Sequence, residues 1–401
     1  MNYNITDVNG FKFWGAHTGI KSKRRDLAII YSEKPANAAA VFTRNIVVAE
    51  PVKLSRKYIE NGKAQAIVVS SGNANACTGE QGRQAAIAMA ETTAEGLGIP
   101  VEDVLVASTG VIGREFPTKK VVEGIKHNIP KLTKRHIAGS LVANAILTTD
   151  TFPKESFAEF KIGGKKVHMG GIAKGSGMIH PNMGTMLSFI ACDADIDSKL
   201  LQKALQEVVD RTFNMITVDG DTSTNDMVAI LCNGVAGNPK IETEGEDYEI
   251  FKRNLEKVCL PLAKSIVSDG EGSTKLIEYR VKNAKTEEDA RQIIKTISTS
   301  ALVKTAIFGR DPNWGRILAA AGRSGVNFDP DKVDLYIGTQ KEVHLVKDGQ
   351  PTGESLTRVK KMMKATQIHI ALDLHEGNAE ATGWGSDFSY EYVRINAEYT
   401  T

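Results

Sequence analysis

Lys174 to Phe189 reads Lys-Gly-Ser-Gly-Met-Ile-His-Pro-Asn-Met-Gly-Thr-Met-Leu-Ser-Phe. The first half predicts a loop, because Gly175 permits backbone conformations closed to other residues and Pro181 fixes one φ angle. After Gly184, an apolar run predicts a buried strand over 186–191. The stretch therefore predicts a glycine-rich loop that leads directly into the core.

Thr185 stands between that loop and that strand, and its residue type suits two roles. It could be a turn residue whose hydroxyl forms a local hydrogen bond, which is the commoner role. It could also be a nucleophile that first cuts its own chain and then uses its new α-amine as the base. The residues alone leave both roles open.

Length and composition are those of a soluble globular protein. A chain of 401 residues predicts two domains or one large layered domain. The net charge of +2 offers no broad basic face, so neither nucleic acid nor a membrane surface is expected as a partner. No signal peptide or membrane-spanning run is recognised, which predicts a cytoplasmic protein. Most of the four cysteines are expected to be buried free thiols: Cys77, Cys192, Cys232 and Cys259.

Apolar patterns predict strands and helices along the whole chain. Strands are expected over 27–32, 38–42, 66–69, 104–107, 186–191, 227–232, 333–337, 342–347, 367–374 and 387–395. Helices are expected over about 81–97, 118–126, 137–147, 197–211, 246–266 and 286–299. Gly163-Gly164 predicts a hairpin turn. A structural domain boundary is expected within 234–286, where the candidates are polar stretches near 234–246 and 280–286.

Three polar loops contain groups that could bind a ligand. Asn73 and Asn75 could hydrogen-bond a ligand, although such residues usually serve their own turns. Thr109-Gly110 follows a predicted strand and could provide donors to an oxyanion, or simply form a tight turn. Glu271 lies between two glycines, where its carboxylate could meet a cation or remain solvated.

Several familiar sites are excluded. Lys174 precedes Gly175, whereas a phosphate-binding loop needs Gly-Lys-Ser/Thr at the start of a helix. The loop 218–226 has acidic residues but fails the EF-hand template, since Thr224 and Ile230 occupy its glycine and glutamate positions. The histidines do not have the spacing of zinc ligands. No metal site is expected.

Ordered motifs over almost the whole chain resemble one family, the self-processing ornithine acetyltransferases (glutamate N-acetyltransferases) of arginine biosynthesis. The matching stretches are Val-Phe-Thr (41–43), Ala49-x-Pro51-Val52, Ser-Gly-Asn-Ala-Asn-Ala-Cys-Thr-Gly (71–79), Ser-Thr-Gly-Val-Ile-Gly (108–113), Thr-Thr-Asp-Thr (148–151), Lys-Gly-Ser-Gly-Met-Ile (174–179), Val-Asp-Gly-Asp-Thr-Ser-Thr-Asn-Asp (218–226), Gly-Arg-Asp-Pro-Asn-Trp-Gly-Arg (309–316) and Asn-Ala-Glu-Tyr-Thr-Thr (396–401). So many ordered matches make a nucleophilic Thr185 the favoured role.

The resemblance implies an α/β layered sandwich of the N-terminal-nucleophile αββα type, with a second, smaller α/β domain. It implies cleavage between Gly184 and Thr185 into chains 1–184 and 185–401, which would associate as a heterotetramer of two copies of each. Thr185 would be the nucleophile, and Thr109 and Gly110 the oxyanion hole. The implied substrate-binding residues are Thr148, Lys174, Thr185, Glu271, Asn396 and Thr401.

The implied reaction transfers an acetyl group from N-acetylornithine to glutamate by a ping-pong route. It needs no bound cofactor, although acetyl-coenzyme A could be a second acetyl donor. One departure is Gly184, because the family commonly has alanine before the nucleophile. Two alternatives remain: a self-cleaving aminopeptidase or amidase on a similar fold, and a binding protein whose chain stays uncut.

Overall fold

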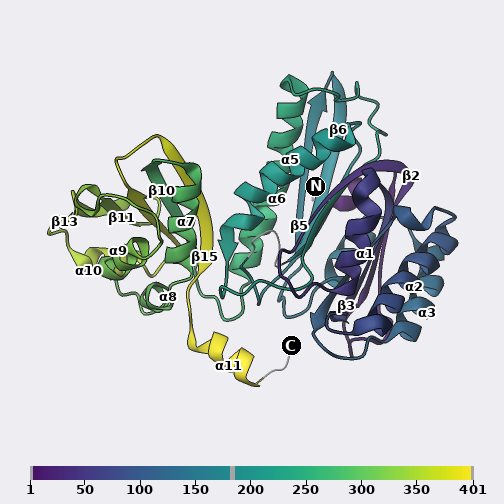
Figure 1. Cartoon of the computed structure of the whole chain (residues 1–401), viewed down its shortest axis with the longest axis horizontal. Coiled ribbons are helices and arrows are strands. Elements are labelled where there is room, and N and C mark those ends of the chain that lie inside the picture. Colours follow the sequence, from purple (N-terminus) through teal and green to yellow (C-terminus); the bar gives the residue numbers. More distant parts are fainter. Residues whose placement is uncertain (1–2, 181–185, 399–401) are drawn as a thin grey trace.

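The computed structural model describes residues 3–180 and 186–398. Figure 1 shows a larger lobe, which contains the first part of the chain, beside a smaller lobe formed by later residues. The strands of the larger lobe are β1 (Phe11–Ala16), β2 (Leu27–Phe42), β3 (Lys63–Asn73), β4 (Val104–Val111), β5 (Lys154–Ile162), β6 (Lys165–Lys174), β7 (Leu187–Cys192) and β9 (Met227–Cys232). They pair in the order β4-β3-β2-β9-β7-β6-β5, and β1 also pairs with β2.

The long strand β2 divides this sheet into two layers. Its first half pairs with β1 and β3, its second half pairs with β9, and the register shifts between Tyr31 and Ala36. A buried apolar cluster then includes Ile67 from the first layer together with Ile172 and Phe189 from the second. The two layers therefore pack face to face around a shared core.

Helices cover both outer faces of the sandwich. The helices of the larger lobe are α1 (Glu50–Tyr58), α2 (Gly79–Leu97), α3 (Thr118–Asn128), α4 (Ile137–Ala145), α5 (Ser198–Arg211) and α6 (Glu246–Ser268). Met89 of α2 shares a core cluster with Val106 of β4, and Val258 of α6 shares another with Ile190 of β7. The order helix–sheet–sheet–helix confirms the expected layered sandwich.

The smaller lobe is a second mixed sheet with its own helices. Its strands, β8 (Ile216–Thr217), β10 (Leu276–Ala284), β11 (Asp334–Gly338), β12 (Glu342–Lys347), β13 (Gln350–Pro351), β14 (Gln367–Asp373) and β15 (Ala379–Ser386), pair in the order β13-β12-β11-β14-β10-β15-β8. The helices are α7 (Glu287–Ser298), α8 (Ala301–Phe308), α9 (Trp314–Gly322) and α10 (Leu356–Met362). The expected second, smaller α/β unit is confirmed.

Short 3₁₀ helices and one last α-helix complete the chain. The 3₁₀ helices are Ile5–Asp7, Ile59–Asn61, Val101–Asp103, Ile129–Lys131, Phe213–Met215 and Pro330–Lys332. Helix α11 (Tyr390–Glu398) follows β15 and leaves the smaller lobe, as Figure 1 shows below the two lobes. This path brings the end of the described chain back toward residues that precede β10.

Most predicted elements are confirmed, including the hairpin turn at Gly163-Gly164 between β5 and β6. The predicted strands 27–32 and 38–42 are halves of one strand, β2. The strand predicted over 387–395 is wrong, because that region contains α11. Ion pairs from Arg394 to Glu391 and Glu398 support one side of this helix, while Tyr390 and Val393 remain exposed. The preceding strand β15 was not predicted.

Within the described residues, no helix combines the length and the apolar character needed to cross a membrane. The four cysteines are free thiols, and all except Cys77 are buried.

Candidate active site

Lys174 joins the two layers of the sandwich at the end of β6. It pairs in register with Leu187, the first residue of β7, and its side chain is buried. Its Nζ donates a hydrogen bond to Oγ1 of Thr109 on β4, at 3.2 Å. Burial lowers the pKa of the Lys174 ammonium group, and the nearby carboxylate of Asp150 opposes this. The site therefore holds a buried ammonium group beside the predicted oxyanion hole.

Thr109 and Gly110 lie where the pairing of β3 with β4 is irregular. The register shifts around Gly72 and Asn73, opposite Thr109 and Gly110. Gly110 has a φ of +133°, and a Cβ atom there would lie 2.4 Å from the carbonyl carbon of Gly72. Only glycine can occupy this position without moving the strands apart.

Glu271 is held from two sides. A Cβ atom on Gly177 would lie 2.4–2.6 Å from the Glu271 carboxylate atoms, so the glycine leaves room for this side chain. Nδ2 of Asn396, on α11, donates a hydrogen bond to Oε2 of Glu271 at 3.0 Å. Gly272 has a φ of +67° and lets the backbone of Tyr392 approach, since a Cβ there would lie 2.4 Å from its nitrogen. Helix α11 thus completes this part of the site.

A basic loop holds the segment that carries Thr148. Arg24 donates hydrogen bonds to the carbonyl oxygens of Thr148 and Asp150, both at 3.2 Å, and Lys21 donates to the carbonyl of Leu147. The loop itself is shaped by buried Asp26, whose carboxylate accepts four hydrogen bonds from residues 18–21. Burial lowers the pKa of Lys21 to about 8, despite the opposing charge of Asp26.

Behind Thr148 lies a cluster of buried charges. Nζ of Lys154 lies 2.7 Å from Oδ1 of Asp150 and 2.6 Å from Oδ2 of Asp269, and all three side chains are inaccessible or nearly so. Asp150 also accepts hydrogen bonds from the backbone nitrogens of Thr148 and Gly175. Burial alone would raise the pKa of Asp150, but the ammonium groups of Lys174 and Lys154 outweigh it and lower that pKa to about 2.

Residues 178–180, which precede the predicted nucleophile, are fixed by the loop after β8. The carboxylate of Asp219 accepts hydrogen bonds from the backbone nitrogens of Met178 and Ile179, at 2.6 and 2.9 Å. Oγ1 of Thr222 donates to the carbonyl of His180 at 2.8 Å. These contacts define where the chain enters the region of the predicted nucleophile.

The start of β9 brings two polar residues to the same region. Asn225 donates hydrogen bonds to the carbonyl oxygens of Ala74 and Ser108, and so connects the two layers. Asp226 is fully buried, and burial raises the pKa of its carboxyl group well above the ordinary value. Met227, the next residue, pairs with Leu187 at the start of β7.

The structure brings several predicted site residues together. Thr109, Gly110 and Lys174 meet at one point, Glu271 meets Asn396, and Thr148 reaches Lys174 through the carboxylate of Asp150. The backbone nitrogen of Glu271 donates a hydrogen bond to the carbonyl of Ser176 at 3.0 Å, and the charge of Glu271 acts on Lys174, so the two groups of residues lie near each other. Gly184, Thr185 and Thr401 lie outside the described residues.

Asn73 and Asn75, which could have bound a ligand, serve their own turns. Oδ1 of Asn73 accepts a hydrogen bond from the nitrogen of Asn75, and Nδ2 of Asn75 donates to the carbonyl of Gly82. Asn75 has a φ of +45°, which asparagine tolerates better than most residues. Both are structural residues.

Sequence reasoning assigned no role to the buried cluster or to the basic loop. Asp150 stands in the family motif Thr-Thr-Asp-Thr, and Asp269 lies two residues before Glu271, but the sequence does not show that either side chain is buried. The loop had a clear signal, because Lys21-Ser-Lys-Arg-Arg25 places four cations within five residues. In the part of the chain that the structure describes, no group of three or more His, Cys, Asp or Glu side chains is arranged to hold a metal ion.

A family model and two relatives compared by sequence match this chain over nearly its full length. The model of the ArgJ family matches residues 12–401. Arginine biosynthesis bifunctional protein ArgJ of Symbiobacterium thermophilum is 49% identical over 400 residues, which cover 99% of this chain and 98% of that protein. The protein of the same name in Staphylococcus epidermidis is 51% identical over 399 residues, with the same coverage. A crystal structure of Arginine biosynthesis bifunctional protein argJ from Bacillus halodurans matches with a TM-score of 0.52 and 46% identity, over 54% of this chain and 100% of that chain.

Proposed function

The chain belongs to the ArgJ family, and on that premise we propose that it transfers the acetyl group of N2-acetyl-L-ornithine to L-glutamate in arginine biosynthesis. The observation that carries this proposal is the presence, in one site, of a buried ammonium group and a buried carboxylate, Lys174 and Glu271. Acetylornithine offers the complementary pair, a carboxylate and a side-chain ammonium. Burial strengthens both attractions, because water screens them less.

The nucleophile in this scheme is Thr185, released by cleavage of the Gly184–Thr185 bond. Its hydroxyl is a weak nucleophile until a base removes the proton, and the new α-amine of the same residue provides that base. Chains 1–184 and 185–401 stay associated, and two copies of each form a heterotetramer. The ordered contacts around residues 178–180 support the maturation step, since they fix the chain that enters the cleavage site.

Thr109 and Gly110 stabilise the oxyanion that forms when the nucleophile attacks the acetyl carbonyl. A donor aimed at such an oxyanion contributes about 3–4 kcal/mol in comparable sites. The hydrogen bond from Lys174 polarises the Thr109 hydroxyl and leaves its proton free to point elsewhere. This arrangement supports a role in the transition state.

The remaining predicted site residues recognise the substrate. Lys174 meets the α-carboxylate as a point charge, and Glu271 accepts the side-chain ammonium. Thr148, Asn396 and Thr401 add polar contacts. Residues of both predicted chains would therefore contact one substrate molecule.

The reaction runs in two halves. The hydroxyl oxygen of Thr185 forms a bond to the acetyl carbon, the bond to the ornithine nitrogen breaks, and the hydroxyl proton passes through the α-amine to the leaving amine. Ornithine departs, and the amine of glutamate then attacks the acetyl ester by the same steps in reverse. Acetyl-coenzyme A would acylate the same hydroxyl as a second donor. The scheme needs no metal or bound cofactor.

The test combines chain analysis with product analysis. The parent protein should run as two fragments on a denaturing gel, Thr185→Ala should remain one chain, and incubation with acetylornithine should add one acetyl group to the 185–401 fragment. Acetylglutamate should form only when glutamate is present. A self-cleaving amidase would instead release acetate at the same rate with or without glutamate, and an uncut chain with no acetyl-enzyme would indicate a binding protein.

A further inference from the structure

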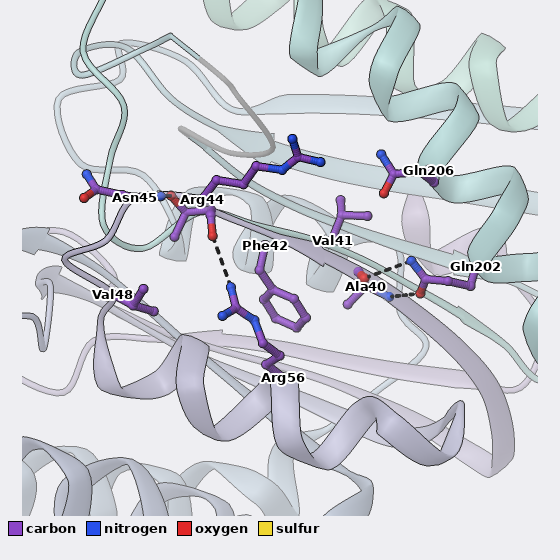
Figure 2. A pocket seen from close by; sticks show the side chains of 10 residues that line it. Ala40, Val41, Phe42, Arg44, Asn45, Val48, Arg56, Gln202 and Gln206 are labelled. Atoms are coloured by element: carbon purple, nitrogen blue, oxygen red, sulfur yellow. Dashed lines mark hydrogen bonds between the residues drawn. The ribbon is translucent and has the colours of Figure 1, made fainter.

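A pocket of about 470 Å³ lies beside the end of β2, between α1 and α5. Figure 2 shows Arg56 reaching up from α1 and Arg44 extending across the pocket toward α5. Arg56 lies 5.5 Å from the ring centre of Phe42 and donates a hydrogen bond to the carbonyl of Thr43 at 3.1 Å. Asn45 and Gln202 add amide groups to the wall, so hydrogen-bond donors line several sides of the pocket.

A second pocket, of about 300 Å³, lies where the smaller lobe approaches the sandwich. Lys295 on α7 and Arg323 after α9 provide its charged groups, and Thr222 lies in its wall. Nδ2 of Asn45, in the wall of the first pocket, donates a hydrogen bond to the carbonyl of Thr222 at 2.8 Å. One hydrogen-bonded contact therefore joins the walls of the two pockets.

The cations of both pockets form one group, which we call the basic tract: Arg44, Arg56, Lys295 and Arg323. Among the described residues, no carboxylate lines either pocket. None of these four cations forms an ion pair with any acid in residues 3–180 or 186–398, although ion pairs are frequent elsewhere on the surface. Four unpaired cations around two adjoining pockets suit a ligand with several negative charges better than a single carboxylate.

Electrostatic interactions connect the two pockets. Burial lowers the pKa of Lys295, and the positive charges of Arg291 and, to a smaller extent, Arg44 add to this effect. Glu288 and Asp210 oppose it, but neither carboxylate lies within ion-pair distance of Lys295. An anion bound between Arg44 and Lys295 would reduce the repulsion between these two cations. A phosphate group should therefore bind there in preference to water.

Hydrogen bonds connect the walls of the two pockets to residues close to the candidate active site. The nitrogen of Thr43, in the first pocket, donates to the carbonyl of Asp226 at 3.1 Å. Thr222, in the second, donates to the carbonyl of His180. The tract thus adjoins residues 178–180, which precede the predicted nucleophile, and the start of β9, so a ligand held there could extend one end toward the nucleophile.

We propose that the basic tract binds the phosphate groups of a nucleotide-bearing acyl thioester, of which acetyl-coenzyme A is the test case. This inference rests on the proposed acetyl transfer and deepens it by assigning the phosphates of a second donor to a place in the fold. In the corresponding step the acetyl carbon forms a bond to the nucleophile oxygen, the carbon–sulfur bond breaks, and the hydroxyl proton passes to the leaving thiolate.

The test compares donors with and without phosphate groups. Arg44 and Lys295 donate no side-chain hydrogen bond to any described residue, so Arg44→Gln/Lys295→Gln should fold like the parent, which a thermal melt checks. This variant should lose at least roughly tenfold in kcat/KM for acetyl-coenzyme A, because each charged contact to phosphate is strong. Its kcat/KM for acetylornithine and for the phosphate-free thioester S-acetyl-N-acetylcysteamine should stay unchanged. Calorimetry should show weaker binding of coenzyme A itself.

The control removes two exposed cations on other helices, as Lys126→Gln/Lys360→Gln, and should leave all donors unaffected. Equal losses for the phosphate-free thioester, unchanged binding of coenzyme A, or a parent enzyme that ignores acetyl-coenzyme A would each overturn the inference. Failure of the parent to transfer acetyl from acetylornithine would instead overturn the proposed function.

Discussion

The ammonium nitrogen of Lys174 lies 3.2 Å from the hydroxyl oxygen of Thr109, and this contact joins strands from opposite layers of the sandwich. The hydroxyl accepts one hydrogen bond from a buried cation, which orients its own proton. The pair therefore links the substrate-binding charge to the oxyanion hole. A substitution at either residue should therefore also affect the other.

Thr109→Val keeps the shape of the side chain and removes the hydroxyl. We expect acetyl transfer to slow by roughly 10²-fold, mostly in kcat, because the donor acts only once negative charge develops. Steady-state kinetics in both substrates measures this. Thr109→Ser, which keeps the hydroxyl, should retain most activity. A change confined to KM would make Thr109 a binding residue.

Glu271→Gln keeps the hydrogen bond with Asn396 possible but removes the negative charge. The kcat/KM for N-acetylornithine should fall by roughly tenfold or more, since hydrogen bonds to charged groups contribute about 1.5–3 kcal/mol. N-Acetylnorvaline, which lacks the side-chain ammonium, is the matched donor and should be affected little. Equal losses for both donors would show that Glu271 does not recognise the ammonium.

Gly177→Ala should displace the Glu271 carboxylate, because the new methyl group would lie 2.4–2.6 Å from it. The variant should therefore lose discrimination between the same two donors, although the carboxylate is still present. Gly322→Ala, on α9 with nothing within 4 Å, is the control. Unchanged discrimination in Gly177→Ala would mean that Glu271 can move without loss of function.

Lys154→Met leaves the carboxylates of Asp150 and Asp269 buried together without the cation between them. The free energy of unfolding should fall by about 3–5 kcal/mol, as when one partner of a buried pair is removed. Urea denaturation measures it. Lys166→Met breaks an exposed ion pair with Glu159 and should cost about 0–1 kcal/mol. Similar costs for both variants would contradict the structural role of the cluster.

The lowered pKa of the Asp150 carboxyl group predicts that the protein loses stability in acid. Its pKa is lowered from 3.8 to about 2 in the folded protein. Between these values the unfolded chain binds a proton that the folded chain does not, so the stabilisation is present above about pH 4 and is lost as pH falls toward 2. The contribution is roughly 2 kcal/mol. Asp150→Asn should flatten the acid side of a plot of unfolding free energy against pH; an unchanged slope would assign the loss to other groups.

The sequence predicted the elements whose signals are local. The β5–β6 hairpin followed from Gly163-Gly164, and β9 and β12 were predicted with the bounds the structure has, because apolar runs there are short and clearly ended. Helix α11 was missed because its aromatic and β-branched residues favour a strand. Contacts between residues distant in sequence favour the helix instead. The main ones are the close approach of Gly272 to the backbone of Tyr392 and the hydrogen bond between Glu271 and Asn396.

The residues of the candidate site likewise divide into those that the sequence predicted and those that it did not. Motifs identified Lys174, Thr109 and Glu271, and the structure places them in one region. The cluster of Asp150, Lys154 and Asp269 could not be predicted, because Lys154 and Asp269 are 115 positions apart and a charged residue in a sequence gives no sign of burial. The basic tract likewise takes its cations from two helices and two loops, so no single stretch revealed it.

The buried cluster also constrains how its residues can be inherited. Asp150 and Asp269 balance Lys154 and Lys174, so the loss of any one leaves a charge stranded in the interior, at a cost of several kcal/mol. Selection should remove single replacements, while paired replacements that keep the charges of the cluster balanced can persist. Among distant relatives the cluster should therefore persist whole or disappear in matched steps, as one hereditary unit.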